Sequence, residues 1–249
     1  MPVSSVQFAQ VPWGYATGLK ITNDATTPNT KLNIAAGSIL DSTGVYQLTN
    51  SASVTIDTGT TGLNGLDTGV LLASRLYYLY IVADPVTQQT TGAIASLSAT
   101  PLLPFGYSAY ALVGYAFTDG SVHFLKGYWT AGKTNYRKFA YDAPIATAVT
   151  AGNSASFAAV ALTNFVPPVE DLPVSIAYAY TPNAASDIFA MTPGNGTGNA
   201  VAIRGQVAAV VNSGNATVFS KVTSAVPEID YKVSAGTVAI NVAGFDFTI

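Results

Sequence analysis

The stretch Tyr77-Tyr78-Leu79-Tyr80-Ile81-Val82 decides the fold class, because aromatic and β-branched residues of this kind favour strands. The run ends at Asp84-Pro85. Ala109–Phe117 is a second run of the same kind, and Val54–Asp57 alternates apolar and polar residues with a period of two. These segments predict strands.

Turn residues follow the second run and separate the remaining strand candidates. Asp119-Gly120 stops it, and Ser121–Leu125 then has the composition of a returning strand, which predicts a tight hairpin. Gly, Pro, Asn and Asp clusters divide the later candidates at short intervals, which is typical of a sandwich or barrel. These later candidates are Val174–Tyr180, Ala200–Val211, Thr217–Val222 and Val238–Val242.

Helical periodicity is nearly absent. Thr147–Leu162 is rich in alanine, but Gly152 and Asn153 interrupt it, so a helix there is only an alternative. We therefore predict an all-β protein with two antiparallel β-sandwich or barrel-like domains and an extended N-terminal arm. The predicted boundaries are 1–18 for the arm, 19–130 for the first domain, 131–143 for a linker of raised charge density, and 144–249 for the second domain.

The composition indicates extensive contact with other subunits. Charged residues make up 9% of the chain, whereas an average soluble domain has about 25%. Hydrophobic residues make up 49%, with 14 Tyr and 11 Phe. The alternative is a polar but uncharged surface of Thr, Ser and Asn.

The net charge and the absence of targeting segments in the sequence argue against a nucleic-acid partner and against a membrane span. The net charge is −3, whereas a nucleic-acid partner requires a basic face. One basic cluster, Lys126, Lys133, Arg137 and Lys138, is interpreted as a solvated linker or subunit contact. The chain has no cysteine, no apolar stretch that could cross a membrane and no secretory signal, so we expect it to fold in a cytoplasm.

Two Asp-Thr-Gly triplets, Asp57-Thr58-Gly59 and Asp67-Thr68-Gly69, match the signature of aspartic proteases. They start ten residues apart, which is too close for the separate lobes of a two-lobed protease. Turn chemistry explains both, because Asp accepts local backbone hydrogen bonds and Gly supplies a positive φ.

Other catalytic residues are scarce. His123 is the only histidine, in a predicted strand beside a hairpin turn, and Glu170 and Glu228 are the only glutamates. A Ser–His–Asp triad would have to use His123, and a histidine zinc site would need further ligands. A carboxylate pair for glycoside hydrolysis is not indicated, although one could form in space. We predict a non-enzymatic protein without metal or cofactor.

Aromatic side chains in or near predicted turns are the best binding candidates, because they can stack on sugar rings or anchor an interface. The candidates for ligand binding are Tyr107, Tyr110, Trp129 and Tyr136. The candidates for docking of the arm on a neighbour are Val11, Pro12, Trp13 and Tyr15. The alternative is that most of these residues pack in the core or between subunits.

Several segments of the first half form an ordered pattern over about residues 15–130. They are Gly18–Asp24, Leu32–Ser38, Asp41–Gly44, Asn64–Gly69, Tyr77–Val82 with Asp84-Pro85, Ser96–Thr100, Pro104–Tyr107 and Leu112–Gly114. This pattern resembles a module of tailed-bacteriophage virion proteins of the tail-fibre or head-fibre type.

The resemblance implies a virion component, usually a homotrimer, that assembles in the host cytoplasm and is released by lysis. It brings no catalytic motif. The implied role is a tail-fibre or tail-tip component involved in host-surface attachment, with other virion proteins and host polysaccharide or protein as partners. The alternatives are a capsid decoration or head-fibre protein that stabilises the head, and a glycan-degrading or other hydrolase.

Overall fold

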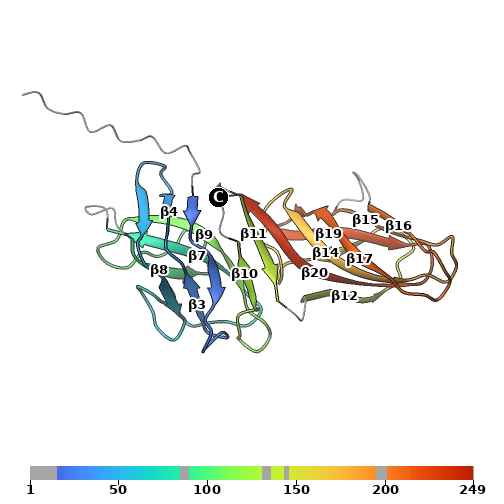
Figure 1. Ribbon diagram of the computed structural model, residues 1–249, viewed down its shortest axis with the longest axis horizontal. Helices are drawn as coiled ribbons and strands as arrows, with labels where there is room; N and C mark the ends of the chain where they lie inside the picture. The colour runs from blue at the N-terminus through green and yellow to red at the C-terminus, as the bar shows by residue number, and fades with distance from the viewer. Residues whose placement is uncertain (1–15, 85–89, 131–135, 143–145, 195–200, 249) are drawn as a thin grey trace, which may run out of the picture.

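The computed structural model describes residues 16–84, 90–130, 136–142, 146–194 and 201–248 (Figure 1). Every secondary-structure element in these ranges is a β-strand, and the strands pair antiparallel. This confirms the predicted all-β class. The strands are β1 (Ala16–Gly18), β2 (Ile21–Asn23), β3 (Lys31–Ile34), β4 (Gly37–Leu40), β5 (Gln47–Asn50), β6 (Val54–Asp57), β7 (Leu76–Ala83), β8 (Thr90–Ser96), β9 (Ala109–Phe117), β10 (Gly127–Trp129), β11 (Tyr136–Tyr141), β12 (Ala146–Gly152), β13 (Ala158–Ala161), β14 (Pro173–Thr181), β15 (Ile188–Pro193), β16 (Val201–Arg204), β17 (Asn212–Phe219), β18 (Lys221–Thr223), β19 (Val226–Val233) and β20 (Thr237–Thr248).

The N-terminal half, blue to green in Figure 1, is built from three sheets. Strands β1, β4 and β5 form the first, and β8, β7 and β9 form the second. Strands β10, β2, β3 and β6 belong to the third. Strand β7 is central in its sheet and buried on both faces over most of its length, which explains why its sequence is a continuous apolar and aromatic run.

The C-terminal half is a sandwich of two sheets. Strands β17, β14, β20 and β12 form one sheet, and β13, β18, β19, β15 and β16 form the other. Buried Val174 and Ile176 alternate with less buried residues along β14, which is the pattern of an inward-facing sheet. The ring centroids of Tyr180 in β14 and Phe189 in β15 lie 5.8 Å apart, so these side chains join the two sheets.

Strand β20 connects the two halves. It pairs with β12 and β14 along its first part and with β11 along its last, while β11 pairs with β10 and β10 with β2. One nine-stranded sheet therefore extends through both halves, and their buried side chains form one continuous core. The predicted linker 131–143 is thus wrong for residues 136–141, which form β11 because they pair on both sides. We call the region of β10, β11 and the end of β20 the joint.

Three aromatic side chains fill the joint. The ring centroids of Trp129 lie 5.1 Å from Phe139 and 5.4 Å from Phe245. The indole Nε1 of Trp129 donates a hydrogen bond of 3.0 Å to the carbonyl of Tyr115. Gly114 allows this close approach, because an added Cβ would lie 3.0 Å from the indole.

A buried arginine ties the joint to the N-terminal strands. Arg137 has 0% exposure, and its guanidinium donates to the carbonyls of Leu19 at 2.8 Å and Gly18 at 3.3 Å. Both residues have positive φ, at the kink where the chain passes from β1 to β2. Burial lowers the pKa of Arg137 to about 10, so it is charged at neutral pH. The predicted solvated cluster is therefore wrong for Arg137, although Lys126 and Lys138 are exposed. Lys133 lies outside the described residues.

Three sequence predictions differ from the structure in detail. The alternative helix at Thr147–Leu162 is absent, since residues of this segment form β12 and β13. Among the described residues of the long candidate Ala200–Val211, Val201–Arg204 is strand and 205–211 is a loop. Ser220 divides the candidate Thr217–Val222 between β17 and β18.

The predicted hairpin strand Ser121–Leu125 does not form. A single bridge joins Thr118 to Phe124, and the segment between them is a loop. The carboxylate of Asp119 accepts hydrogen bonds from the amides of Ser121 and His123, both at 2.8 Å. These bonds wrap the chain around Asp119 and place Val122 at φ 64°.

Replacing Val122 with glycine is expected to raise the free energy of unfolding by about 1 kcal/mol, because a β-branched residue is strained at positive φ. Urea unfolding would measure the gain. Val70→Gly is the matched control, since Val70 is 69% exposed and is not among the positive-φ residues. Glycine there should lower stability slightly through chain entropy. Equal losses in both variants would contradict the strain at Val122.

Candidate functional site

A pocket of about 540 Å³ opens on the sheet of β8, β7 and β9. Its base carries four tyrosines from β7 and β9, one wall is the end of β4 with the following turn, and Phe247 from β20 adds a side chain from across the joint. We call it the tyrosine pocket. It is lined by Ile39, Leu40, Asp41, Ser42, Gly44, Tyr78, Tyr80, Ala99, Tyr110, Ala111, Leu112, Tyr115 and Phe247.

A β-bulge brings the tyrosines to one face. Tyr78 pairs with Tyr115, but the register shifts so that Tyr80 pairs with Leu112, which leaves Val113 as the extra residue of β9. Without this bulge, alternation along β9 would place Tyr110 and Tyr115 on opposite faces of the sheet. With it, both tyrosines lie on the face that carries Tyr78 and Tyr80.

The rings contact one another in a chain. Tyr78 stacks on Tyr80 with centroids 6.4 Å apart, and Tyr80 meets the edge of Tyr110 at 5.6 Å. Tyr78 meets Tyr115 at 5.4 Å, and Tyr115 meets Phe247 at 4.9 Å, both edge to face. Such contacts fix the ring orientations, so the aromatic surface of the pocket is preformed.

Asp41 shapes the wall of the pocket. Its carboxylate accepts hydrogen bonds from the amides of Val45 and Tyr46, both at 2.9 Å, and from the hydroxyl of Thr43 at 2.7 Å. The amide of Ser42 donates to the carbonyl of Tyr110 at 2.8 Å, which attaches this turn to β9. Burial would raise the pKa of Asp41, but these hydrogen bonds outweigh it and lower the pKa. The carboxylate is therefore a charged structural group whose local partners occupy it.

The tyrosine hydroxyls differ in their partners. Tyr80 donates to the carbonyls of Ser98 and Ala99, at 3.2 and 2.7 Å. Within the described ranges, the hydroxyls of Tyr78, Tyr110 and Tyr115 have no hydrogen-bond partner. Tyr78 and Tyr110 are half-buried and line the pocket, whereas Tyr115 is 4% exposed. Burial raises the pKa of Tyr78 and Tyr115, which keeps both phenols neutral at physiological pH.

The predicted aromatic candidates have different positions. Tyr110 lines the pocket, and Tyr107 is half-buried against the small cluster around Tyr80. Trp129 is 1% exposed, so its prediction as an exposed binding residue is wrong, because the joint closes over it. The side chain of Tyr136 lies outside the described residues. The arm candidates also lie outside them, namely Val11, Pro12, Trp13 and Tyr15.

The pocket tyrosines that sequence reasoning missed as binding residues are Tyr78, Tyr80 and Tyr115. All three stand in the strand runs that decided the fold, and a strand tyrosine is ordinarily assigned to the core. The available signal was the excess of tyrosine in two neighbouring strands, because two adjacent strands can gather such residues on one face.

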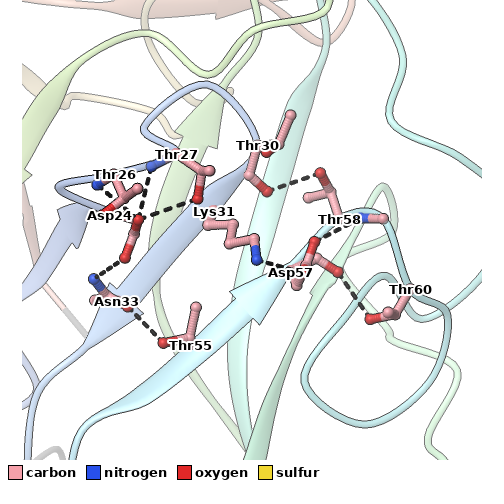
Figure 2. Close-up of polar contacts among 11 residues, drawn as sticks. Asp24, Thr26, Thr27, Thr30, Lys31, Asn33, Thr55, Asp57, Thr58 and Thr60 are labelled. Carbon is pink, nitrogen blue, oxygen red and sulfur yellow. Dashed lines mark hydrogen bonds and ion pairs between the residues drawn. The ribbon is translucent and has the colours of Figure 1, made fainter.

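Figure 2 shows a second cluster of side chains, on β3, β6 and the loop after β2, beside an open groove of about 680 Å³. Asp24 accepts from the amides of Thr26 at 2.9 Å and Thr27 at 2.8 Å, and from the side chain of Asn33 at 3.1 Å. Lys31 forms an ion pair of 2.8 Å with Asp57 across the two strands. These polar groups bind one another, so the cluster is a structural network.

This network predicts an acid-sensitive element. Hydrogen bonds, first that from the Thr27 amide and then those from Asn33 and Thr26, lower the pKa of Asp24 from 3.8 to about 2. Because the folded pKa lies below the unfolded one, the stabilisation is complete above pH 3.8 and is lost as the pH falls through about 2.

Urea unfolding between pH 5 and pH 2 would measure this loss. The variant Asp24→Asn should show a shallower fall in stability across that window, since position 24 no longer titrates. Lys31 and Asp57 remain in both proteins and cancel in the comparison. Identical pH profiles would show that Asp24 does not contribute.

The Asp-Thr-Gly triplets have only some of the features of turn residues. Asp57 accepts from the amide of Gly59 at 3.0 Å in addition to its ion pair with Lys31. Asp67 accepts from the amide of Leu102 at 3.0 Å, which fixes the loop that follows β8. Asp57 therefore makes the local contact of a turn residue, and Gly69 has the expected positive φ of 74°. Gly59 is not among the positive-φ residues, and the contact of Asp67 is long-range, so the turn interpretation fits each triplet only in part.

His123 lies exposed in the loop around Asp119, with its Nδ1 3.7 Å from the carboxylate. In the part of the chain that the structure describes, no three His, Asp or Glu side chains gather to hold a metal ion. The same ranges contain no helix of the length and apolarity that a membrane span requires.

The end of the C-terminal half opposite the joint exposes apolar side chains. Loop 205–211 carries Val207, Val210 and Val211, which are 56%, 51% and 58% exposed, and has no charged residue. The amide of Ala209 in this loop donates to the carbonyl of Pro182, just after β14. Thr181 of β14 pairs with the first residue of β20, so the loop lies far from the N-terminal half (Figure 1).

Comparisons with known proteins give little. No protein-family model matches the chain, and no curated protein matches it. A carbohydrate-binding module from Cellvibrio mixtus lichenase 5A, solved with cellotriose, is 14% identical and covers 50% of this chain and 88% of its own, with a TM-score of 0.20. A structure of infectious bursal disease virus, Gx strain, is 11% identical and covers 93% of this chain and 70% of its own, with a TM-score of 0.21. At these TM-scores neither likeness bears on function.

Proposed function

We propose that this chain is a non-enzymatic structural protein on the surface of a tailed-phage virion. It acts as a homotrimeric tail-fibre or tail-tip component that attaches the particle to the host surface. Attachment uses weak sites that the symmetry of the trimer and of the particle repeats, so that avidity replaces affinity at each site.

The chemistry of the tyrosine pocket is the observation that carries this proposal. The pocket offers aromatic rings and neutral hydroxyls, which are groups that bind a ligand without reacting with it. Its carboxylate, Asp41, already accepts three local hydrogen bonds. A general acid or base needs a group that can exchange a proton with the substrate. The arrangement therefore favours binding without chemistry.

The ordered resemblance over residues 15–130 and the shape of the molecule add support. Loop 205–211 lies at the end of the C-terminal half away from the N-terminal half, and the molecule is elongated between the two (Figure 1). An elongated molecule suits a fibre component with one end toward the particle and one toward the host. The role of Val11, Pro12, Trp13 and Tyr15 as an anchor on the particle is part of the proposal.

Light scattering, imaging of particles and binding to host cells test it. Light scattering on the purified chain should give three times the 25.6 kDa chain mass. Imaging of intact particles should place the chain on the tail, and the purified protein should bind host cells. Absence from purified particles would overturn the proposal, and new reducing ends released from host polysaccharide would show a hydrolase instead.

A capsid decoration or head-fibre role is the second candidate, favoured by exposed apolar side chains on the N-terminal half. Phe105 is 105% exposed at a turn that Gly106 closes with φ 88°, and Leu102 beside it is 64% exposed. A capsid lattice would cover such residues. A copy number close to that of the major capsid protein, with less stable capsids when the chain is missing, would favour this role.

A further inference from the structure

We infer that the tyrosine pocket binds a neutral sugar residue of a polysaccharide. The inference rests on the proposed function only for the source of that polysaccharide, the host surface. The pocket and its ligand class stand on the geometry alone.

The aromatic faces are the first argument. A sugar ring has an apolar C–H face that stacks on tyrosine, and the half-buried Tyr78 and Tyr110 line the pocket with their rings. Tyr80, which is 2% exposed, contacts both rings and supports them from below. Their mutual contacts hold them in place, so little ordering entropy is lost on binding.

The hydroxyls are the second argument. Tyr78 and Tyr110, both half-buried on the pocket lining, carry phenols with no hydrogen-bond partner among the described residues. Each phenol can donate and accept one hydrogen bond, which matches the mixed character of sugar hydroxyls. A purely apolar ligand would cover these groups and leave them unpaired, at a cost in affinity.

Charge is the third argument and sets the ligand class. Among the described residues, the lining contains no Lys, Arg or His, and its one charged group there is the occupied carboxylate of Asp41. A sugar acid would meet that negative charge with no cation to offset it. The pocket therefore selects neutral sugars over acidic ones.

Size is the fourth argument. The volume of about 540 Å³ falls within the range of small-ligand sites, which is about 300–1,000 Å³. It accommodates one or two sugar rings, so the affinity of a single site is low. Repetition across a trimer and a particle then supplies the avidity.

The test uses the purified full-length chain. Titration calorimetry and saturation-transfer NMR would measure binding of neutral oligosaccharides of glucose, galactose and N-acetylhexosamine, of a uronic-acid oligosaccharide, and of polysaccharide extracted from host cells. We expect a neutral ligand to bind and the uronic acid to fail. If every neutral probe fails at millimolar concentration, or the acidic one binds as well as they do, the inference is wrong.

Variants locate the site. Tyr110→Ala removes a ring and should weaken binding at least tenfold, while Tyr110→Phe removes only the hydroxyl and should weaken it about threefold to tenfold. The control Tyr128→Ala changes a tyrosine that is 42% exposed and lies outside the pocket, and should leave binding within twofold. Equal binding by Tyr110→Ala and the unmodified protein would overturn the assignment.

A second pair of variants avoids the core. Ser42 is exposed on the pocket wall, so Ser42→Trp should block the pocket without unfolding the protein. Ser51→Trp is its control, because Ser51 is exposed outside the lining. Retained sugar binding in Ser42→Trp would contradict the inference. A protein that binds neutral sugar but is missing from particles would refute the proposed function alone, whereas one present on particles without sugar binding would refute only the pocket.

Discussion

Arg137→Ala is expected to lower the free energy of unfolding by about 3 kcal/mol or more, because it removes two hydrogen bonds of a buried guanidinium and leaves a cavity. The carbonyls of Gly18 and Leu19 would lose their donors at a kink where both residues have positive φ. An added Cβ at Gly18 would lie 2.3 Å from the carbonyl oxygen of Ala36, so this kink has no room to relax. The substitution should therefore also weaken the contact between β11 and the N-terminal strands.

Urea unfolding followed by tryptophan fluorescence would measure this effect. Lys138→Ala is the control on the same strand, since Lys138 is exposed, and should change stability by no more than about 0.5 kcal/mol. Arg137→Met separates packing from hydrogen bonding, because methionine fills the space without donating. A loss as small in Arg137→Ala as in Lys138→Ala would show that the guanidinium does not hold the kink.

Trp129→Ala is expected to cost about 3 to 5 kcal/mol, the range for removing a large buried aromatic side chain. The indole contacts Phe139 and Phe245 and binds the carbonyl of Tyr115, so its removal empties the centre of the joint. Thermal unfolding by circular dichroism would measure the loss. Tyr128→Ala, one residue earlier and exposed, should stay close to the unmodified protein.

This variant also discriminates between the two interpretations of Trp129. A core residue affects stability first, whereas a surface binding residue affects ligand binding with little effect on stability. Trp129→Phe should recover part of the stability, because it restores an aromatic ring in the same space. Loss of polysaccharide binding by a fully stable Trp129→Ala protein would restore the sequence-based interpretation of Trp129.

Much of the fold could be predicted from local patterns. Strands were predicted from the alternation in Val54–Asp57 and from the apolar runs that form β7 and β9. Burial of a strand on one face or on both faces determines which residue types it contains, so the pattern can be read locally. Ser121–Leu125 shows the limit of this reasoning. Its composition suits a strand, but the Asp119 side chain offers the backbone a competing set of hydrogen bonds, which turns the chain into a loop.

The candidate site was harder to predict, because it depends on register and contacts between distant strands. The bulge at Val113 decides which face Tyr115 occupies, and no local pattern marks it. Trp129 lies near predicted turn residues, as a surface aromatic residue would. The long strand β20 nevertheless brings Phe245 over it. Arg137 belongs to a basic cluster in sequence, but pairing on both sides of β11 places it inside.

The length of β20 gives the molecule a mechanical property. Its 12 residues extend from the end that carries loop 205–211 to the joint, and its partners β12, β14 and β11 lie antiparallel along it. Hydrogen bonds in such pairs run perpendicular to the strands. A pull between the two ends of the molecule therefore loads many of these bonds in shear at the same moment, instead of opening them one after another. In the proposed attachment role, this geometry would resist drag between the particle and the host cell.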